Sequence, residues 1–142
     1  MPTPVKQSSP LRAPADESCF VCGPANPRSL HVSFRVEPKA SAVEADYEPG
    51  RETQGYDGVV HGGIIAALLD EAMVKAANAS GRAFATASLS VRFRSPGRVG
   101  EPLVIRGRVV ERRGRLVRAS ATIHAPGGRL VAQSEGSLVR HG

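Results

Sequence analysis

Apolar and polar residues alternate at two places in the first third of the chain, and this alternation predicts two β-strands. Between residues 29 and 36 every second side chain is apolar, and the alternation returns at residues 43–47 after a turn around Pro38. A period of two is typical of a strand with one buried face. We therefore expect half-buried strands at residues 29–36 and 43–47.

The middle of the chain changes from this period of two to a long apolar segment. Few polar side chains interrupt residues 62–79, and the Ser80-Gly81 pair that follows is a helix-stop signal. A helix that is apolar almost all round must be covered on most of its sides. We expect one long buried helix over residues 62–79.

Four more strands follow the predicted helix, at residues 86–94, 103–111, 115–124 and 130–139. Turn-forming residues at 113–114 and 126–128 join the last three strands as hairpins. A helix is about 10 to 12 Å across, whereas six strands at about 4.8 Å span well over 20 Å. The pattern therefore predicts an α+β fold in which a curved antiparallel sheet of about six strands wraps one long central helix.

The size of the chain bounds its organisation. A length of 142 residues with 41% hydrophobic content fits one domain with a real core. Residues 1–17 are rich in proline and polar residues, so we expect a flexible tail there and a single domain over residues 18–142. No apolar run approaches the roughly 18 residues of a membrane span, and the start lacks a secretory signal. We expect a cytoplasmic protein without membrane association.

Positive charge is concentrated in the second half of the chain. Residues 82–142 hold 12 Arg and three acidic residues, a net charge of +9, whereas residues 1–81 hold seven basic and 10 acidic residues, a net charge of −3. Such a surface could hold the phosphates of an acyl carrier or a nucleic acid, or could simply be a solvated sheet face. Aromatic residues make up only 4% of the chain, so little stacking surface is available and we expect no nucleic-acid binding.

The two cysteines, Cys19 and Cys22, have the spacing of half a metal site or of a redox pair. A second pair of Cys or His ligands at suitable spacing is missing from the sequence. We therefore interpret this segment as a structural turn and expect no metal and no cofactor.

Several candidate catalytic groups lie on the predicted helix. It begins with His61, Gly62 and Gly63, and glycine leaves the first backbone N–H groups uncovered at the end where the helix dipole favours negative charge. Asp70 lies further along among apolar neighbours, where poor solvation would make its carboxylate more reactive. These neighbours are Ala66, Leu68, Leu69, Ala72, Met73 and Val74.

The spacing of these two groups has a geometric consequence. Gly62 and Asp70 are eight residues apart, which is roughly 12 Å along a helix and too far for both to contact one carbonyl group. If both act, the amide of one subunit must meet the carboxylate of another. We therefore expect the site at a two-fold dimer interface, twice per dimer, with a homodimer as the minimum and a homotetramer as the expected assembly.

Three motifs, together with the order of strands, helix and strands, carry a family resemblance. They are Cys-Phe-Val-Cys-Gly-Pro-Ala-Asn-Pro at residues 19–27, Gln-Gly-Tyr-Asp-Gly-Val-Val-His-Gly-Gly at residues 54–63, and Leu-Leu-Asp-Glu-Ala at residues 68–72. Over roughly residues 19–139 the chain resembles the hotdog-fold acyl-CoA thioesterases of the phenylacetate-degradation (PaaI-like) group. The resemblance implies that Asp70 attacks the thioester or activates water, and that the Gly62 amide of the partner subunit polarises the carbonyl.

The resemblance also brings in neighbouring polar groups. It implies a hydroxyl from Thr86 or Ser88 that orients the attacking group, and a period of two would put both on one strand face with Ser90, opposite Ala87 and Leu89. His61 would orient the loop, hydrogen-bond the thioester as part of the catalytic group, or cap the helix. Gln54 and Gly63 would contact the substrate. Glu71 is the competing carboxylate, but consecutive helical residues point about 100° apart and the family position selects Asp70.

We predict acyl-CoA hydrolysis at this site. The phosphates of coenzyme A would lie against arginines that end or follow the strand with the hydroxyls, namely Arg92, Arg94 and Arg98, and the acyl group against Val59, Ile64, Leu68 and Met73. The alternatives are a non-catalytic hotdog module that binds acyl-CoA, and a hydratase or dehydratase, whose His and carboxylate spacings are not found here. Acyl length, the type of acyl carrier and the choice between nucleophile and general base stay open.

Overall fold

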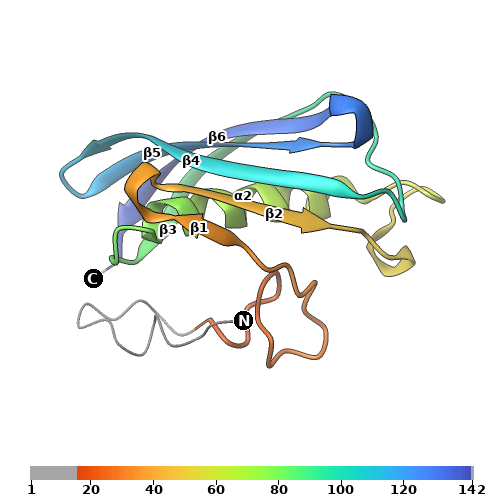
Figure 1. The fold of residues 1–142 in the computed structure, drawn as a ribbon, viewed down its shortest axis with the longest axis horizontal. Coiled ribbons are helices and arrows are strands. Elements are labelled where there is room, and N and C mark those ends of the chain that lie inside the picture. Colours follow the sequence, from red (N-terminus) through yellow and green to blue (C-terminus); the bar gives the residue numbers. More distant parts are fainter. Residues whose placement is uncertain (1–15, 142) are drawn as a thin grey trace.

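The computed structural model describes residues 16–141. A six-stranded antiparallel sheet arches over one long helix, as the sequence predicts (Figure 1). The strand order is β1-β2-β4-β5-β6-β3, so β1 and β3 form the two edges. The elements are β1 (Arg35–Glu37), β2 (Ala42–Tyr47), α2 (Gly62–Asn78), β3 (Phe84–Phe93), β4 (Leu103–Arg113), β5 (Leu116–His124) and β6 (Leu130–Arg140), with short 3-10 turns at Pro38–Ala40, Arg51–Thr53 and Pro126–Gly128.

Helix α2 packs its apolar face into the concave side of the sheet. Its buried side chains are Ile65, Leu68, Leu69, Ala72, Met73, Ala76 and Ala77. The helix comes so close to β4 that a Cβ atom added to Gly107 would lie 2.5 Å from the carbonyl oxygen of Ala72. Glycine at position 107 therefore permits the close approach by which the sheet wraps the helix.

The predicted first strand is largely wrong. Only Arg35–Glu37 joins the sheet, and all three of these residues are exposed, including Val36. Upstream, His31 has a φ of +55°, which interrupts an extended strand. The N–H of Val32 bonds to the carbonyl oxygen of Val21 instead of to a sheet neighbour. The alternation at residues 29–36 thus reflects packing against another loop, which the sequence pattern cannot distinguish from pairing in a sheet.

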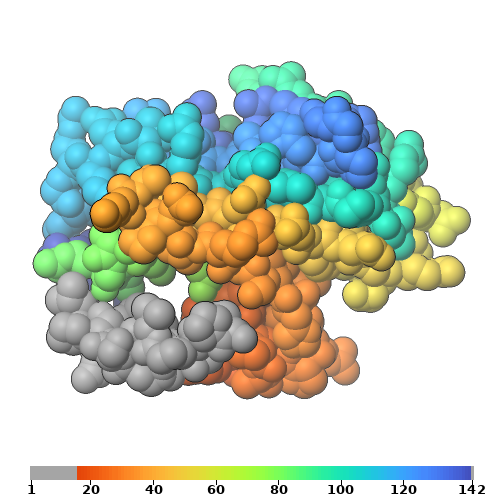
Figure 2. All heavy atoms as spheres, in the orientation of Figure 1, coloured from red at the N-terminus to blue at the C-terminus, as the bar shows by residue number. Residues whose placement is uncertain are grey.

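The segment at residues 16–34 covers the side of α2 that the sheet leaves open. In Figure 2 this segment (orange) lies beneath the sheet, and its side chains Val21 and Val32 are buried in the same core as the helix. The predicted tail at residues 1–17 lies outside the described residues except for its last two. Within residues 16–141, no helix has the length and apolar character needed to cross a lipid bilayer.

Candidate active site

The start of α2 is organised by His61. Its side-chain Nδ1 accepts a hydrogen bond of 2.8 Å from the N–H of Gly63, so His61 is the N-cap of the helix. The carbonyl oxygen of His61 accepts bonds from Ile64 and Ile65. Of the roles predicted for His61, helix capping is the one that the structure shows. Because the cap occupies the Gly63 N–H, that amide is not available to a substrate in this conformation.

Gly62 is the remaining donor at this helix end. No residue between 16 and 141 accepts a hydrogen bond from its N–H, and the residue is exposed. The ring of Phe93, the last residue of β3, lies beside it, since a Cβ atom added to Gly62 would be 3.6 Å from Phe93 Cε1 and Cζ. An exposed N–H at the positive end of a helix can stabilise a developing oxyanion.

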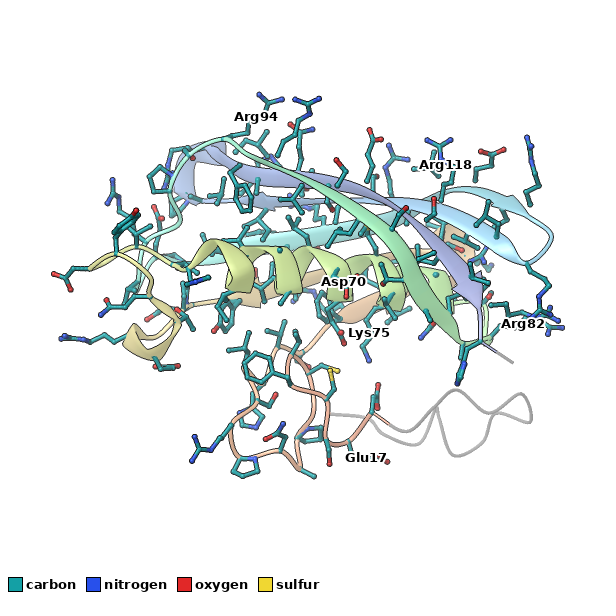
Figure 3. All side chains as sticks on the ribbon, turned by 180° about the vertical axis from the view of Figure 1, so that it is seen from behind. Glu17, Asp70, Lys75, Arg82, Arg94 and Arg118 are labelled. Atoms are coloured by element: carbon teal, nitrogen blue, oxygen red, sulfur yellow. The ribbon has the colours of Figure 1, made fainter. Side chains whose placement is uncertain are left out.

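Asp70 lies two turns further along α2 and is half-buried (Figure 3). Its Oδ1 accepts a hydrogen bond of 2.6 Å from the hydroxyl of Thr86 on β3. Its Oδ2 has no partner among residues 16–141. One oxygen is therefore held by a donor while the other stays open to attack a carbonyl or to take a proton from water. The apolar enclosure expected for Asp70 is incomplete in the single chain, because β3 is an edge strand.

Thr86 and Ser88 do not share a strand face, so the predicted arrangement is wrong. A β-bulge between them leaves Ala87 without a partner, with Thr86 opposite Leu138 and Ser88 opposite Ser137 on β6. Thr86 therefore lies on the helix side, together with Leu89 and Phe93, whereas Ser88 lies on the outer face. The structure thus brings Thr86 to Asp70 and leaves Ser88 away from it.

Glu71 points to a different environment from that of Asp70. Its side chain is 14% exposed and lies near the thiol of Cys19 and the ammonium of Lys75, whose Nζ is 2.6 Å from Asp16 Oδ2. Burial, with the nearby Glu71 carboxylate, raises the pKa of the Cys22 thiol. Burial opposes the charge of Lys75, but its bond to Asp16 and the surrounding anionic groups raise the pKa of its ammonium overall.

The remaining predicted binding residues surround the loop that leads into α2. Gln54 Oε1 accepts a hydrogen bond of 3.0 Å from the Gly58 N–H, so this oxygen holds the loop rather than a substrate. Arg98 pairs with Val59 in an isolated bridge beside the helix start. Arg92 lies opposite Gln133 and Arg94 bonds to Gln133, so both lie on the sheet face away from Asp70. Figure 3 shows Arg94 pointing away from Asp70.

Two of the four predicted acyl contacts are also wrong. Leu68 and Met73 are fully buried against the sheet of their own chain, and Ser134 donates a bond to the Met73 sulfur. Val59 and Ile64 are only half-buried and stay accessible. Periodicity could not separate these groups because the helix is apolar on several sides.

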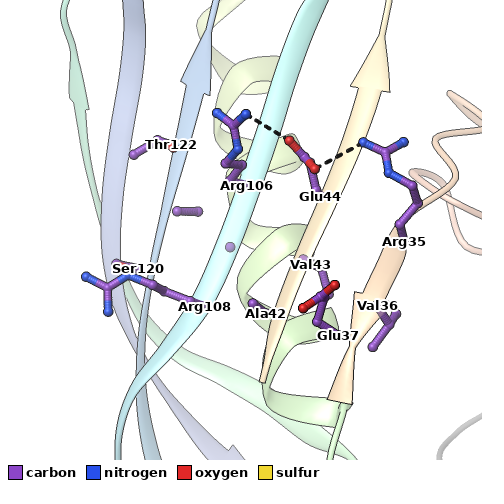
Figure 4. A pocket seen from close by; sticks show the side chains of 12 residues that line it. Arg35, Val36, Glu37, Ala42, Val43, Glu44, Arg106, Arg108, Ser120 and Thr122 are labelled. Atoms are coloured by element: carbon purple, nitrogen blue, oxygen red, sulfur yellow. Dashed lines mark ion pairs between the residues drawn. The ribbon is translucent and has the colours of Figure 1, made fainter. Parts of the chain in front are cut away.

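One hollow of the described chain lies on the outer face of the sheet and not at Asp70. It has a volume of about 480 Å³ and lies over β1, β2, β4 and β5. Within it, Glu44 forms ion pairs with both Arg35 and Arg106 (Figure 4). Glu44 thus has two positively charged partners, and none of the predicted catalytic residues lines this hollow. A second hollow, beside Ser88 and Arg118, also lies on the face of the sheet that points away from the helix. Neither of these two hollows is lined by Asp70, Thr86 or Gly62.

Comparisons with known proteins agree with this arrangement. A family model described as the thioesterase superfamily matches residues 57–132. A comparison with curated proteins found no match. A solved thioesterase superfamily protein is 31% identical with a TM-score of 0.78, and the matched region covers 87% of this chain but only 60% of that protein.

Two further solved structures share the fold. A phenylacetic acid degradation-related protein from Ralstonia eutropha JMP134 is 26% identical with a TM-score of 0.73, covering 82% of this chain and 89% of that one. A protein from Streptococcus mutans UA159, solved bound to acetyl CoA, is 22% identical with a TM-score of 0.73, covering 78% and 89% of the two chains.

Proposed function

The chain belongs to the thioesterase superfamily and has the PaaI-like hotdog fold, and from this we propose that it hydrolyses an acyl-coenzyme A thioester to the free acid and coenzyme A. The observation that carries the proposal is the Asp70–Thr86 pair, a carboxylate held by one oxygen next to an exposed strand edge. The relative solved with acetyl CoA supports coenzyme A as the acyl carrier.

Asp70 delivers the attack in this mechanism. Thr86 fixes the carboxylate through Oδ1, which leaves Oδ2 to attack the thioester carbon directly or to take a proton from an attacking water. In the direct route the thiolate of coenzyme A leaves as a mixed anhydride forms on Asp70, and water then hydrolyses the anhydride to the acid and frees the carboxylate. In the other route the thiolate leaves as the carbonyl re-forms after water has added. In both routes water supplies an oxygen of the acid, and the proton that water loses passes to the thiolate. The Gly62 N–H stabilises the oxyanion that develops on the thioester oxygen.

The two groups come from different subunits. Gly62 and Asp70 are eight residues apart on one straight helix, roughly 12 Å, so they cannot reach the same carbonyl. The edge strand β3 offers the way to bring two copies together, because it is ten residues long, is exposed over residues 85–90 and pairs only with β6. A long unprotected edge favours pairing with another strand.

Pairing of two β3 strands also sets the geometry of the site. In an antiparallel pair centred near Leu89, Thr86 of one copy lies opposite the segment around Phe93 of the other. Phe93 contacts Gly62 within its own chain, so the pairing carries the second copy's helix start toward Asp70. Phe93 and Leu89 are 59% and 38% exposed in the single chain, and the pairing covers them. We therefore propose a homodimer with two sites, each formed from both chains.

The substrate occupies the groove between the copies. Val59, Ile64 and Phe93 are accessible apolar groups near the helix start and suit the acyl chain. Arg98, beside Val59, is placed to meet the nucleotide phosphates, whereas Arg92 and Arg94 on the outer face are not.

A thiol-release assay with short, medium, long and aryl acyl-CoAs tests this function. We expect saturable release of coenzyme A from at least one class. Tight binding of acyl-CoA without any hydrolysis across the panel would contradict the proposal, and would identify the protein as an acyl-CoA-binding module instead.

A further inference from the structure

The loop at residues 19–23 has the shape of a metal-binding knuckle. The backbone N–H groups of Val21 and Cys22 point at the Cys19 sulfur, with N–Sγ distances of 3.4 and 3.5 Å. The N–H of Gly23 closes the turn on the Cys19 carbonyl oxygen at 2.8 Å. A Cβ atom at Gly23 would lie 2.3 Å from the Cys19 nitrogen, so only glycine fits there. Amide donors directed at a sulfur suit a thiolate better than a thiol, because they stabilise its negative charge.

A third ligand reaches the two sulfurs from helix α2. Glu71 Oε2 is 3.7 Å from Cys19 Sγ, and the ligand atoms of Cys19, Cys22 and Glu71 all lie within 4.8 Å of one another. Cys22 is buried, and the side chain of Glu71 is 14% exposed. In Figure 3 the segment at residues 16–34 lies beneath helix α2. The sequence suggested no such partner because Glu71 is 52 positions from Cys19.

The charges around the cluster fit a divalent cation. Metal binding releases the thiol protons, and the resulting two thiolates and one carboxylate carry three negative charges, which a divalent cation reduces to one. Lys75 Nζ lies 4.0 Å from Glu71 Oε2 and places a positive charge beside the cluster. The ligand atoms need to close by only about 1 Å to reach the separations of a tetrahedral site with Zn–S near 2.3 Å and Zn–O near 2.1 Å.

We propose that Cys19, Cys22 and Glu71 bind Zn²⁺, with a water molecule in the fourth position. Two soft sulfur ligands select against Mg²⁺ and Ca²⁺, and a tetrahedral set of two sulfurs and two oxygens would suit Zn²⁺. The ion fastens the irregular segment at residues 16–34 to helix α2, one residue after Asp70. Its role is structural, since its ligand Glu71 points about 100° away from Asp70 around the helix and Thr86 bonds to Asp70. The inference does not depend on the proposed hydrolysis.

Metal titration of the full chain tests the site. The protein is reduced, treated with a chelator and exchanged into chelator-free buffer, and a thiol assay confirms two reduced cysteines. Co²⁺ is then added, followed by Zn²⁺. We expect one Co²⁺ per chain with thiolate-to-cobalt charge-transfer absorption, displacement by one Zn²⁺, and a rise in the melting temperature.

Three variants locate the ligands. Cys19→Ser and Cys22→Ser should each weaken the charge-transfer absorption and lower the affinity at least about tenfold, and Glu71→Gln should lower the affinity by a similar factor. Glu135→Gln, an exposed carboxylate on the outer sheet face, should bind as the wild type does. The absence of charge-transfer absorption in the reduced wild type would overturn the proposal regardless of how the variants fold. Unchanged Zn²⁺ affinity in a folded Glu71→Gln variant would overturn the three-ligand site.

Discussion

The two sides of helix α2 that carry its adjacent acidic residues differ in what completes them. Glu71 faces groups from its own chain, since the segment at residues 16–34 covers it with two thiols and Lys75 stands beside it. Asp70 faces Thr86 on an edge strand, where the chain ends its sheet and leaves apolar side chains exposed. The difference teaches that burial alone does not locate a reactive carboxylate. Both acids are of intermediate exposure and differ in their neighbours, so we propose a structural role for Glu71 and a second copy of the chain to complete the site at Asp70.

The different roles proposed for the two acids are tested most strongly by replacing each carboxylate with an amide. Asp70→Asn should lower kcat by about 10²- to 10⁴-fold, because the amide can neither attack nor take a proton. Glu71→Gln should lower the melting temperature and reduce kcat far less. Steady-state thiol release and thermal unfolding measure both variants, with Glu135→Gln as the matched control. An Asp70→Asn protein that is folded and fully active would remove Asp70 from the mechanism.

The helix start gives the next largest effect. Gly62→Pro removes one N–H at the first helical position, where proline is well tolerated and the extended conformation of His61 (ψ 137°) suits a following proline. We expect kcat to fall about 10²- to 10³-fold while the fold is kept. Gly62→Ala keeps the N–H, and its Cβ would make only ordinary contact with Phe93, so it is the control. Equal activity of the two variants would exclude the amide as the oxyanion donor.

The strand facing Asp70 can be tested on both of its faces. Thr86→Val keeps the shape of the side chain but removes the donor to Oδ1, and kcat should fall about 10- to 100-fold because a bond to a charged group is lost. Ser88→Ala on the outer face should change kcat less than twofold. A larger loss in Ser88→Ala than in Thr86→Val would mean that the bulge has been assigned the wrong way round.

The smallest effect concerns stability at the exposed helix end. His61→Ala removes the side-chain acceptor for the Gly63 N–H and should lower the free energy of unfolding by about 1 kcal/mol. His61→Asn supplies another capping acceptor and should recover most of that loss. Denaturant unfolding of the three proteins measures the difference, and equal midpoints would show that the cap contributes no stability.

The helix and the last four strands could be predicted because each produces a strong local pattern. Residues 62–79 were expected to be helical and α2 is Gly62–Asn78, since the apolar run and the Ser80-Gly81 stop act locally. The bulge at Ala87 and the loop partners of Val32 depend on contacts between distant segments, which no period reveals. The contact of Glu71 with Cys19 could not be predicted for the same reason, because the two residues are 52 positions apart. Asp70 and Gly62 could be proposed as site residues because their chemistry and spacing are themselves local, and their roles stay predictions.

The central claim, that each site takes Asp70 from one chain and Gly62 from another, is tested most directly by mixing two inactive variants. Asp70→Asn and Gly62→Pro chains, unfolded together and refolded as a mixture, form heterodimers in which one of the two sites has both native groups. The account predicts that activity returns to about one quarter of the wild-type level, because half of the dimers are mixed and half of their sites are intact. Mixed dimers that form but remain as inactive as either parent would contradict a site built from two chains.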